Sequence, residues 1–264
     1  MSLDVPALSS EVAKPFLLSL ADDELVMGHR LSFWVARGPT IEVDNEVAAI
    51  VQDELGHARL WYDVVAEAGE TIEDLAFGRP AEQRRNTVLV EAPMADFGET
   101  IVRQFLYDRA EELFLSAIRD GDDAELSARA EVALREEAFH REHADVWLDH
   151  LSETEESRAH LEAGFEACLP RSRDLFAFPE GTSQELVEAG VLDRAIPTLH
   201  TEWIEEVVST LSDLPLDVPL RTSPIENDAA DIPDALEGEP ATNGRLGEHT
   251  DELVELAENG FTEF

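Results

Sequence analysis

The sequence predicts an all-α protein built around a four-helix bundle. Four long segments repeat apolar residues at helical spacing, short turns join them in two pairs, and no segment shows the alternation typical of a strand. With 44% apolar residues, the chain of 264 residues can build a substantial core. We expect one domain over residues 1–264, with the bundle at about 10–151 and C-terminal helices and a linker at 152–264.

The four bundle helices are delimited by helix-stopping residues. Gly38-Pro39 ends the first, Gly69 lies just past the second, and Asp120-Gly121 closes the third. Helices of this length are normal in four-helix bundles. The predicted segments are Ser10–Ala36, Glu42–Ala68, Asp96–Arg119 and Asp123–Leu151.

The connections between these helices specify the type of bundle. Short turns make the first and second helices one antiparallel hairpin, and the third and fourth another. A long crossover, Gly69–Ala95, joins the two hairpins, which is the ferritin-like connectivity. Further helices are expected at Glu155–Phe176 and His200–Leu211, and the segment Leu214–Glu239, rich in Pro, Asp and Ser, is expected to be a loop or linker.

The charge of the chain excludes two classes of partner. Nineteen basic residues against 59 acidic ones give a net charge of −40, which repels nucleic acid and anionic membranes. Acidic residues spread along the whole chain, with Lys14 as the only lysine, resemble the surfaces of proteins from salt-accumulating halophiles. An ordinary acidic protein is the alternative. The lone Cys168, the lack of a secretory signal and the lack of a membrane span favour the cytoplasm.

Two Glu-x-x-His motifs carry the candidate chemistry. Glu54 and His57 share one face of the second helix, and Glu137 and His140 share one face of the fourth, so each pair can reach one metal ion. In an acid-rich chain the motif alone is weak evidence. Its placement on paired bundle helices makes it more specific.

The other two helices offer one carboxylate each at matching positions. Glu24 precedes Glu54 by 30 residues, and Asp108 precedes Glu137 by 29, so each hairpin places its acids at the same height. Apolar residues surround all of these positions, and a carboxylate buried there is costly unless a metal or a partner neutralises it. The alternative is that they are surface acids. The predicted metal ligands are Glu24, Glu54, His57, Asp108, Glu137 and His140.

A second layer of the site is also predicted. Asp53 lies four residues before His57, and Glu136 lies four residues before His140. We expect each acid to orient the imidazole of its own helix. His143 is expected to be solvated.

Several stretches resemble the phenylacetyl-CoA epoxidase (phenylacetate-CoA oxygenase) A and C subunits, and the C subunit more closely. Val51-Gln-Asp-Glu-Leu-Gly-His-Ala-Arg59 and Arg135-Glu-Glu-Ala-Phe-His140 are similar to the two metal motifs of that family. The marks of the C subunit are Leu20-Ala-Asp-Asp-Glu-Leu-Val26, Arg30-Leu31, Leu89-Val-Glu-Ala-Pro93, Asp96-Phe97, Thr100-Ile101, Arg103-Gln104 and Gly244-Arg-Leu-Gly-Glu-His-Thr250.

The resemblance implies a subunit of a cytoplasmic multicomponent monooxygenase of aerobic phenylacetate degradation. In that family a catalytic A-type ferritin-like subunit, paired with a C-type one, inserts one oxygen atom of O2 into phenylacetyl-CoA, and a reductase subunit supplies electrons from NADPH. The C subunit is usually the structural partner because it has lost metal ligands, whereas this sequence keeps all six.

Three hypotheses about function follow. The first is a C-type subunit with a site for two iron ions or, alternatively, manganese. The second is a non-catalytic scaffold for a separate catalytic subunit. The third is an iron-storage or di-manganese protein on the same fold, because a fold does not fix a function.

Overall fold

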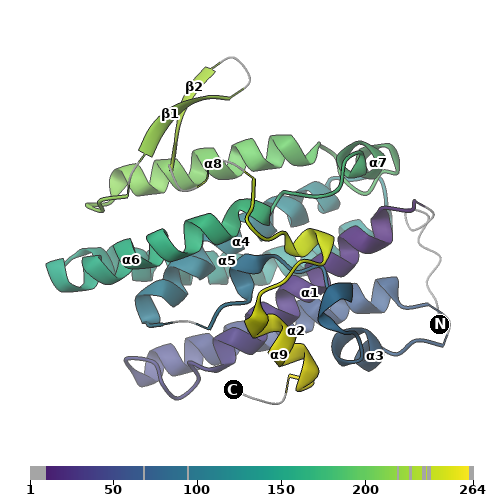
Figure 1. Cartoon of the computed structure of the whole chain (residues 1–264), viewed down its shortest axis with the longest axis horizontal. Coiled ribbons are helices and arrows are strands. Elements are labelled where there is room, and N and C mark those ends of the chain that lie inside the picture. The colour runs from purple at the N-terminus through teal and green to yellow at the C-terminus, as the bar shows by residue number, and fades with distance from the viewer. Residues whose placement is uncertain are drawn as a thin grey trace.

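The computed structural model describes residues 10–261 except 68, 94, 219, 226–227, 234–235 and 237–238. Within this part of the chain the predicted four-helix bundle is confirmed (Figure 1). The first helix packs along the second and the third along the fourth, as expected of two hairpins. The bundle helices are α1 (Ala13–Ser32), α2 (Ile41–Val65), α4 (Phe97–Arg119) and α5 (Ala124–Ser152).

The helix ends follow from local capping chemistry. The side chains of Thr40, Asp96 and Asp123 each accept a hydrogen bond from a backbone N–H in the first turn of α2, α4 and α5. The first helix is shorter than predicted. After Ser32 the chain winds through irregular turns, and Ala36 adopts a left-handed conformation with φ of 64° that no helix continues through.

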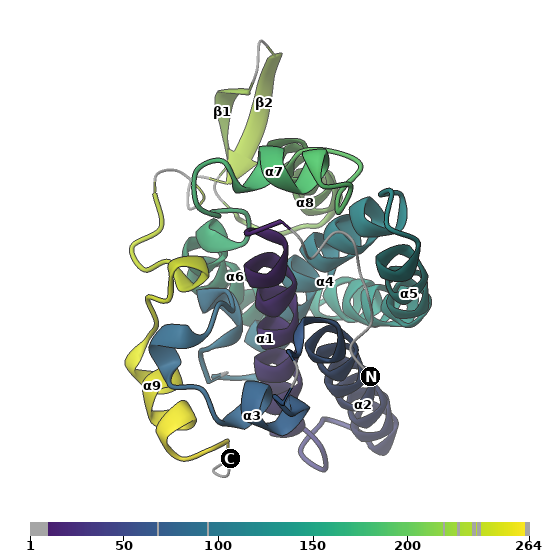
Figure 2. The same ribbon diagram turned by 90° about the vertical axis from the view of Figure 1, so that its right-hand side faces the viewer.

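The remaining helices surround the bundle on three sides. In Figure 2, which looks along the bundle, the crossover and the C-terminal α9 lie beside α1, whereas α6 and α8 cover α4. The α2 and α5 helices lie together on the remaining side. The crossover contains α3 (Ile72–Phe77), η2 (Ala81–Gln83) and η3 (Val88–Val90), and the C-terminal part contains α6 (Glu155–Arg171), η4 (Ser172–Asp174), α7 (Thr182–Glu188), α8 (Ile196–Asp213), η6 (Gly244–Leu246) and α9 (Asp251–Glu258).

One prediction about the C-terminal part was wrong. The segment Leu214–Glu239, expected to be a loop, contains an antiparallel hairpin of β1 (Leu220–Ile225) and β2 (Asp228–Pro233), in which Thr222 pairs with Asp231. Prolines and acidic residues are uncommon in sheets, so the composition of this segment did not predict the strands. The hairpin projects from the helical body next to α8 (Figure 1). No helix in the described residues has the length and apolarity needed to span a bilayer.

A buried ionic network fixes the C-terminal segment to α1. Asp23 Oδ2 accepts a hydrogen bond of 2.6 Å from Arg245 Nη1, and both side chains are almost fully buried. Asp174 accepts hydrogen bonds from the backbone N–H groups of Val88 and Gly244. The contact between Asp23 and Arg245 therefore fixes the C-terminal segment to α1, one residue before Glu24.

Candidate metal centre

The six residues predicted as metal ligands all lie in the interior of the bundle. Each is at most 1% exposed, so none of them is a surface acid or a solvated histidine. The four helices contribute as expected, with one carboxylate on α1, one on α4 and a Glu–His pair on each of α2 and α5. The convergence follows from the antiparallel hairpins, which place Glu24 beside Glu54 and Asp108 near Glu137.

Both imidazoles direct their Nδ1 atom into the cluster. His57 Nδ1 lies 3.4 Å from Glu137 Oε1, and His140 Nδ1 lies 2.9 Å from the same oxygen. His140 Nδ1 is also 3.7 Å from Glu54 Oε1. The ring centroids of the two histidines are 6.1 Å apart. Carboxylates and imidazoles of both halves therefore face one shared interior space.

The outer nitrogens of the histidines bind acids of the opposite helix. His57 Nε2 lies 2.8 Å from Glu136 Oε2, and His140 Nε2 lies 3.4 Å from Asp53 Oδ2. The prediction that each acid orients the histidine of its own helix was wrong, because the pairs cross the seam between α2 and α5. An acid that accepts the Nε2 hydrogen leaves Nδ1 as the ligand atom, which is the usual arrangement around metal-binding histidines.

A seventh residue, Glu111, belongs to the cluster and was not predicted. One ligand atom from each of Glu24, His57 and Glu111 lies within 4.8 Å of the other two, a group that suits one metal ion. Glu111 lies three residues after Asp108 on α4, so both carboxylates share the inner face of that helix. This i, i+3 spacing was the available signal, but we expected only one carboxylate per helix from α1 and α4.

The electrostatics of the cluster favour a bound cation. The carboxylate oxygens of Glu24, Glu54 and Glu111 are buried, and no N–H group of the described chain donates a hydrogen bond to them. Burial, followed by the nearby Glu111 and Glu54 carboxylates, raises the pKa of Glu24 well above its usual value. Burial and the Glu137 carboxylate do the same to the pKa of Glu111 and of Asp108. A divalent cation would relieve these penalties, and this donor set fits iron or manganese.

Glu137 differs from the other acids in the cluster. Although burial disfavours its charged form, the two histidines outweigh burial and lower the pKa of Glu137 to about 2. The same contacts raise the pKa of His140 to about 11. The histidines therefore stabilise the charge of Glu137, whereas the pKa values of Glu24, Asp108 and Glu111 stay raised.

His143 extends the cluster toward the surface. It was expected to be solvated, but it is buried, and burial lowers its pKa to about 4. Its Nδ1 lies 3.2 Å from Gln104 Oε1, and its Nε2 lies 3.6 Å from Glu46 Oε2 on α2. Gln104 Nε2 in turn donates to the backbone oxygen of His140. His143 thus lies near a third acid across the α2/α5 seam, although its Nε2 makes no hydrogen bond within the described residues.

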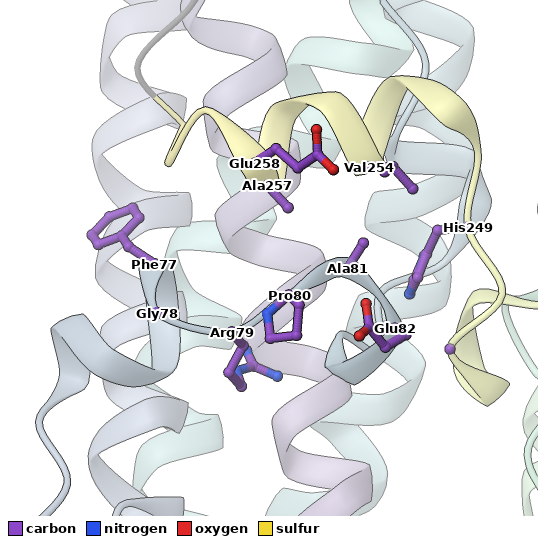
Figure 3. A pocket seen from close by; sticks show the side chains of 11 residues that line it. Phe77, Gly78, Arg79, Pro80, Ala81, Glu82, His249, Val254, Ala257 and Glu258 are labelled. Carbon is purple, nitrogen blue, oxygen red and sulfur yellow. The ribbon is translucent and has the colours of Figure 1, made fainter.

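A surface cavity lies away from this cluster. It has a volume of about 390 Å³ and opens between the crossover and α9, where Phe77, Arg79, His249 and Val254 line it (Figure 3). None of the seven cluster residues lines this cavity. Arg79 is held by an ion pair with the buried Asp22, so its charge is already balanced.

Comparison with known proteins agrees with this architecture. The family described as Phenylacetic acid catabolic protein matches residues 2–259. The C subunit of the 1,2-phenylacetyl-CoA epoxidase of Escherichia coli (strain K12) is 32% identical over 208 residues, which cover 77% of this chain and 83% of that protein. The residues matched by the family include the whole bundle, with both Glu-x-x-His motifs and all seven residues of the cluster. The chain therefore belongs to the phenylacetic acid catabolic protein family.

Proposed function

We propose that this chain is a C-type subunit of a multicomponent phenylacetyl-CoA epoxidase acting in aerobic phenylacetate catabolism. The observation that carries the proposal is the similarity to the C subunit of the Escherichia coli enzyme over most of both chains. In this role the chain works in the cytoplasm with a catalytic A-type ferritin-like subunit and a reductase subunit, and the substrate of the complex is phenylacetyl-CoA.

The proposal includes a metal centre in this chain. Glu24, Glu54, His57, Asp108, Glu137 and His140, together with Glu111, would hold two iron ions, and manganese would use the same ligands. Bound iron would supply the redox chemistry needed for the activation of O2. The chain's own contribution is to orient the ligands. Asp53 and Glu136 hold the Nε2 atoms of the histidines, so that each Nδ1 faces inward.

A non-catalytic scaffold is the second candidate, and one observation favours it. Glu137 lies within 3.4 Å of His57 Nδ1 and 2.9 Å of His140 Nδ1, so these three side chains balance part of their charge without a metal. The acids Glu24 and Glu111 count against this alternative, because no N–H group in the described chain donates a hydrogen bond to their buried oxygens. A scaffold would have to keep them protonated.

Metal analysis of the purified chain, alone and with its A-type partner, separates the two candidates. We expect close to two iron or manganese ions per chain, and replacement of both His57 and His140 by Ala should abolish this binding while the helical circular dichroism is retained. A chain without metal supports the scaffold. If the double variant assembles with its partner and epoxidises phenylacetyl-CoA at the normal rate, catalysis belongs to the other subunit.

A further inference from the structure

One acid–histidine contact between α2 and α5 lies outside the seven-residue cluster. His143 on α5 directs its Nε2 toward Oε2 of Glu46 on α2, and the two atoms are 3.6 Å apart. The His143 side chain is 2% exposed, whereas that of Glu46 is 40% exposed. Nε2 of His143 has no hydrogen-bond partner among the described residues. A buried nitrogen therefore faces a half-exposed carboxylate at a distance too long for a hydrogen bond.

The hydrogen bonds of Gln104 determine which ring nitrogen of His143 carries the hydrogen. Gln104 Nε2 donates to the backbone oxygen of His140 at 3.2 Å, and a backbone oxygen can only accept. The other end of the amide, Oε1, lies 3.2 Å from Nδ1 of His143, so Nδ1 is the donor of this second bond. In a neutral imidazole the remaining nitrogen then has a lone pair and no hydrogen. Nε2 of His143 is therefore an acceptor that faces another acceptor.

A proton shared between the two side chains does not explain this contact. An imidazolium that donated to Glu46 would lie much closer, as His57 Nε2 does at 2.8 Å from Glu136 Oε2. Burial, followed by the charge of His140, also lowers the pKa of His143 to about 4, so its ring is neutral at pH 7. Two acceptors held face to face are stable only when a cation lies between them.

The separation of the two acceptors suits one shared metal ion. Imidazole nitrogens and carboxylate oxygens bind Zn²⁺ at about 2.1 Å, and two such ligands of a tetrahedral ion lie about 3.4 Å apart. The 3.6 Å between His143 Nε2 and Glu46 Oε2 is close to this value. Gln104 holds the outer nitrogen of the imidazole, as the groups around metal-binding histidines usually do. The exposed part of Glu46 gives solvent access to the remaining coordination positions.

We infer that Glu46 and His143 bind a divalent transition-metal ion that prefers tetrahedral coordination, such as Zn²⁺, in a third site separate from the dinuclear centre. The ion joins α2 to α5, because each helix supplies one ligand. Water molecules complete the coordination, so binding is weaker than at a structural site with four protein ligands. The inference does not depend on the proposed function, since neither residue belongs to the seven-residue cluster.

A titration with Co²⁺ tests the site, because the visible absorption of this ion is intense in four-coordinate sites and weak in six-coordinate ones. The dinuclear centre is first disabled by replacing both His57 and His140 with Ala, which keeps the backbone oxygen that Gln104 contacts. The titration is done in 2 M KCl, which screens loose binding to surface acids. In this double variant we expect one Co²⁺ per chain, with the absorption of a four-coordinate ion, and its displacement by Zn²⁺.

Two further substitutions, each added to the double variant, locate the ion. His143→Ala and Glu46→Gln should each weaken Co²⁺ binding at least tenfold. Glu46→Gln keeps the size of a half-exposed side chain, so it tests the site even where His143→Ala disturbs the bundle. The matched control is His150→Ala on the same helix, because His150 Nδ1 lies 3.9 Å from Glu153 Oε2 but the two side chains are 62% and 64% exposed. This control should leave Co²⁺ binding within twofold.

Two results would overturn the inference. One is a double variant that shows no four-coordinate Co²⁺ spectrum although its helical circular dichroism is retained. The other is a spectrum and an affinity that Glu46→Gln leaves unchanged. The proposed function is judged separately, by the metal content of the native chain after desalting, which removes the weakly held third ion, and by turnover of phenylacetyl-CoA.

Discussion

Replacing Arg245 by Met tests how the C-terminal segment is held against α1. Arg245 Nη1 donates to Asp23 Oδ2 at 2.6 Å and to the backbone oxygen of Arg85 at 3.0 Å, and its guanidinium lies over the ring of Phe178. Both members of the ion pair are about 1% exposed. Removing one partner of a buried ion pair costs about 3–5 kcal/mol of unfolding free energy, because the remaining carboxyl must either keep its charge without compensation or bind a proton.

The cost should depend on pH in a predictable direction. Burial raises the pKa of Asp23 to about 7 although Arg245 lowers it, so without Arg245 the pKa rises further. A carboxyl group whose pKa is raised in the folded state contributes a stability that is complete at low pH. This contribution is lost as the pH rises from the unfolded-state pKa to the folded-state pKa. The native protein stops losing this contribution near pH 7, whereas the variant continues to lose it. The penalty should therefore be larger at pH 8 than at pH 6, by at most about 1.4 kcal/mol.

Urea unfolding of the native protein and of Arg245→Met at both pH values measures these differences. The double variant Asp23→Asn, Arg245→Met is the control, because it removes the buried charge together with its partner and should show no such pH dependence. Limited proteolysis reports whether residues 243–261 detach before the bundle unfolds. A penalty below about 1 kcal/mol would refute the view that this ion pair holds the segment, and a penalty that is equal at pH 6 and pH 8 would refute the raised pKa of Asp23.

Three further predictions concern charge. The metal-free protein should lose thermal stability from pH 6.5 to 8.5, because the pKa of His140 is raised from 6.5 to about 11 and the folded chain keeps a proton that the unfolded chain releases in this window. A metal-loaded sample with the same slope would contradict this. The melting temperature should rise between 0.1 M and 2 M KCl, since at 0.1 M the screening length is about 10 Å and the charge of −40 still repels itself; an unchanged value would count against a halophilic origin. Glu111→Gln should weaken Mn²⁺ binding at least tenfold in a calorimetric titration, and Glu112→Gln, whose side chain pairs with Arg141 outside the cluster, should not.

The bundle was predictable because its signals are local. Helical spacing of apolar residues and the capping residues Thr40, Asp96 and Asp123 specify the helices, and the lengths of the connections specify how they pair. The six interior residues followed from spacing within each hairpin. Antiparallel helices place residues equidistant from their turn at the same height, so this prediction needed no knowledge of contacts between the hairpins.

What the sequence did not reveal depends on contacts between distant segments. Asp53 was assigned to His57 on its own helix, but it reaches His140, because α2 meets α5 along a seam whose register no local pattern gives. The contact of Arg245 with Asp23 joins residues more than two hundred positions apart. Both misses concern polar side chains, whose partners are set by tertiary packing rather than by periodicity.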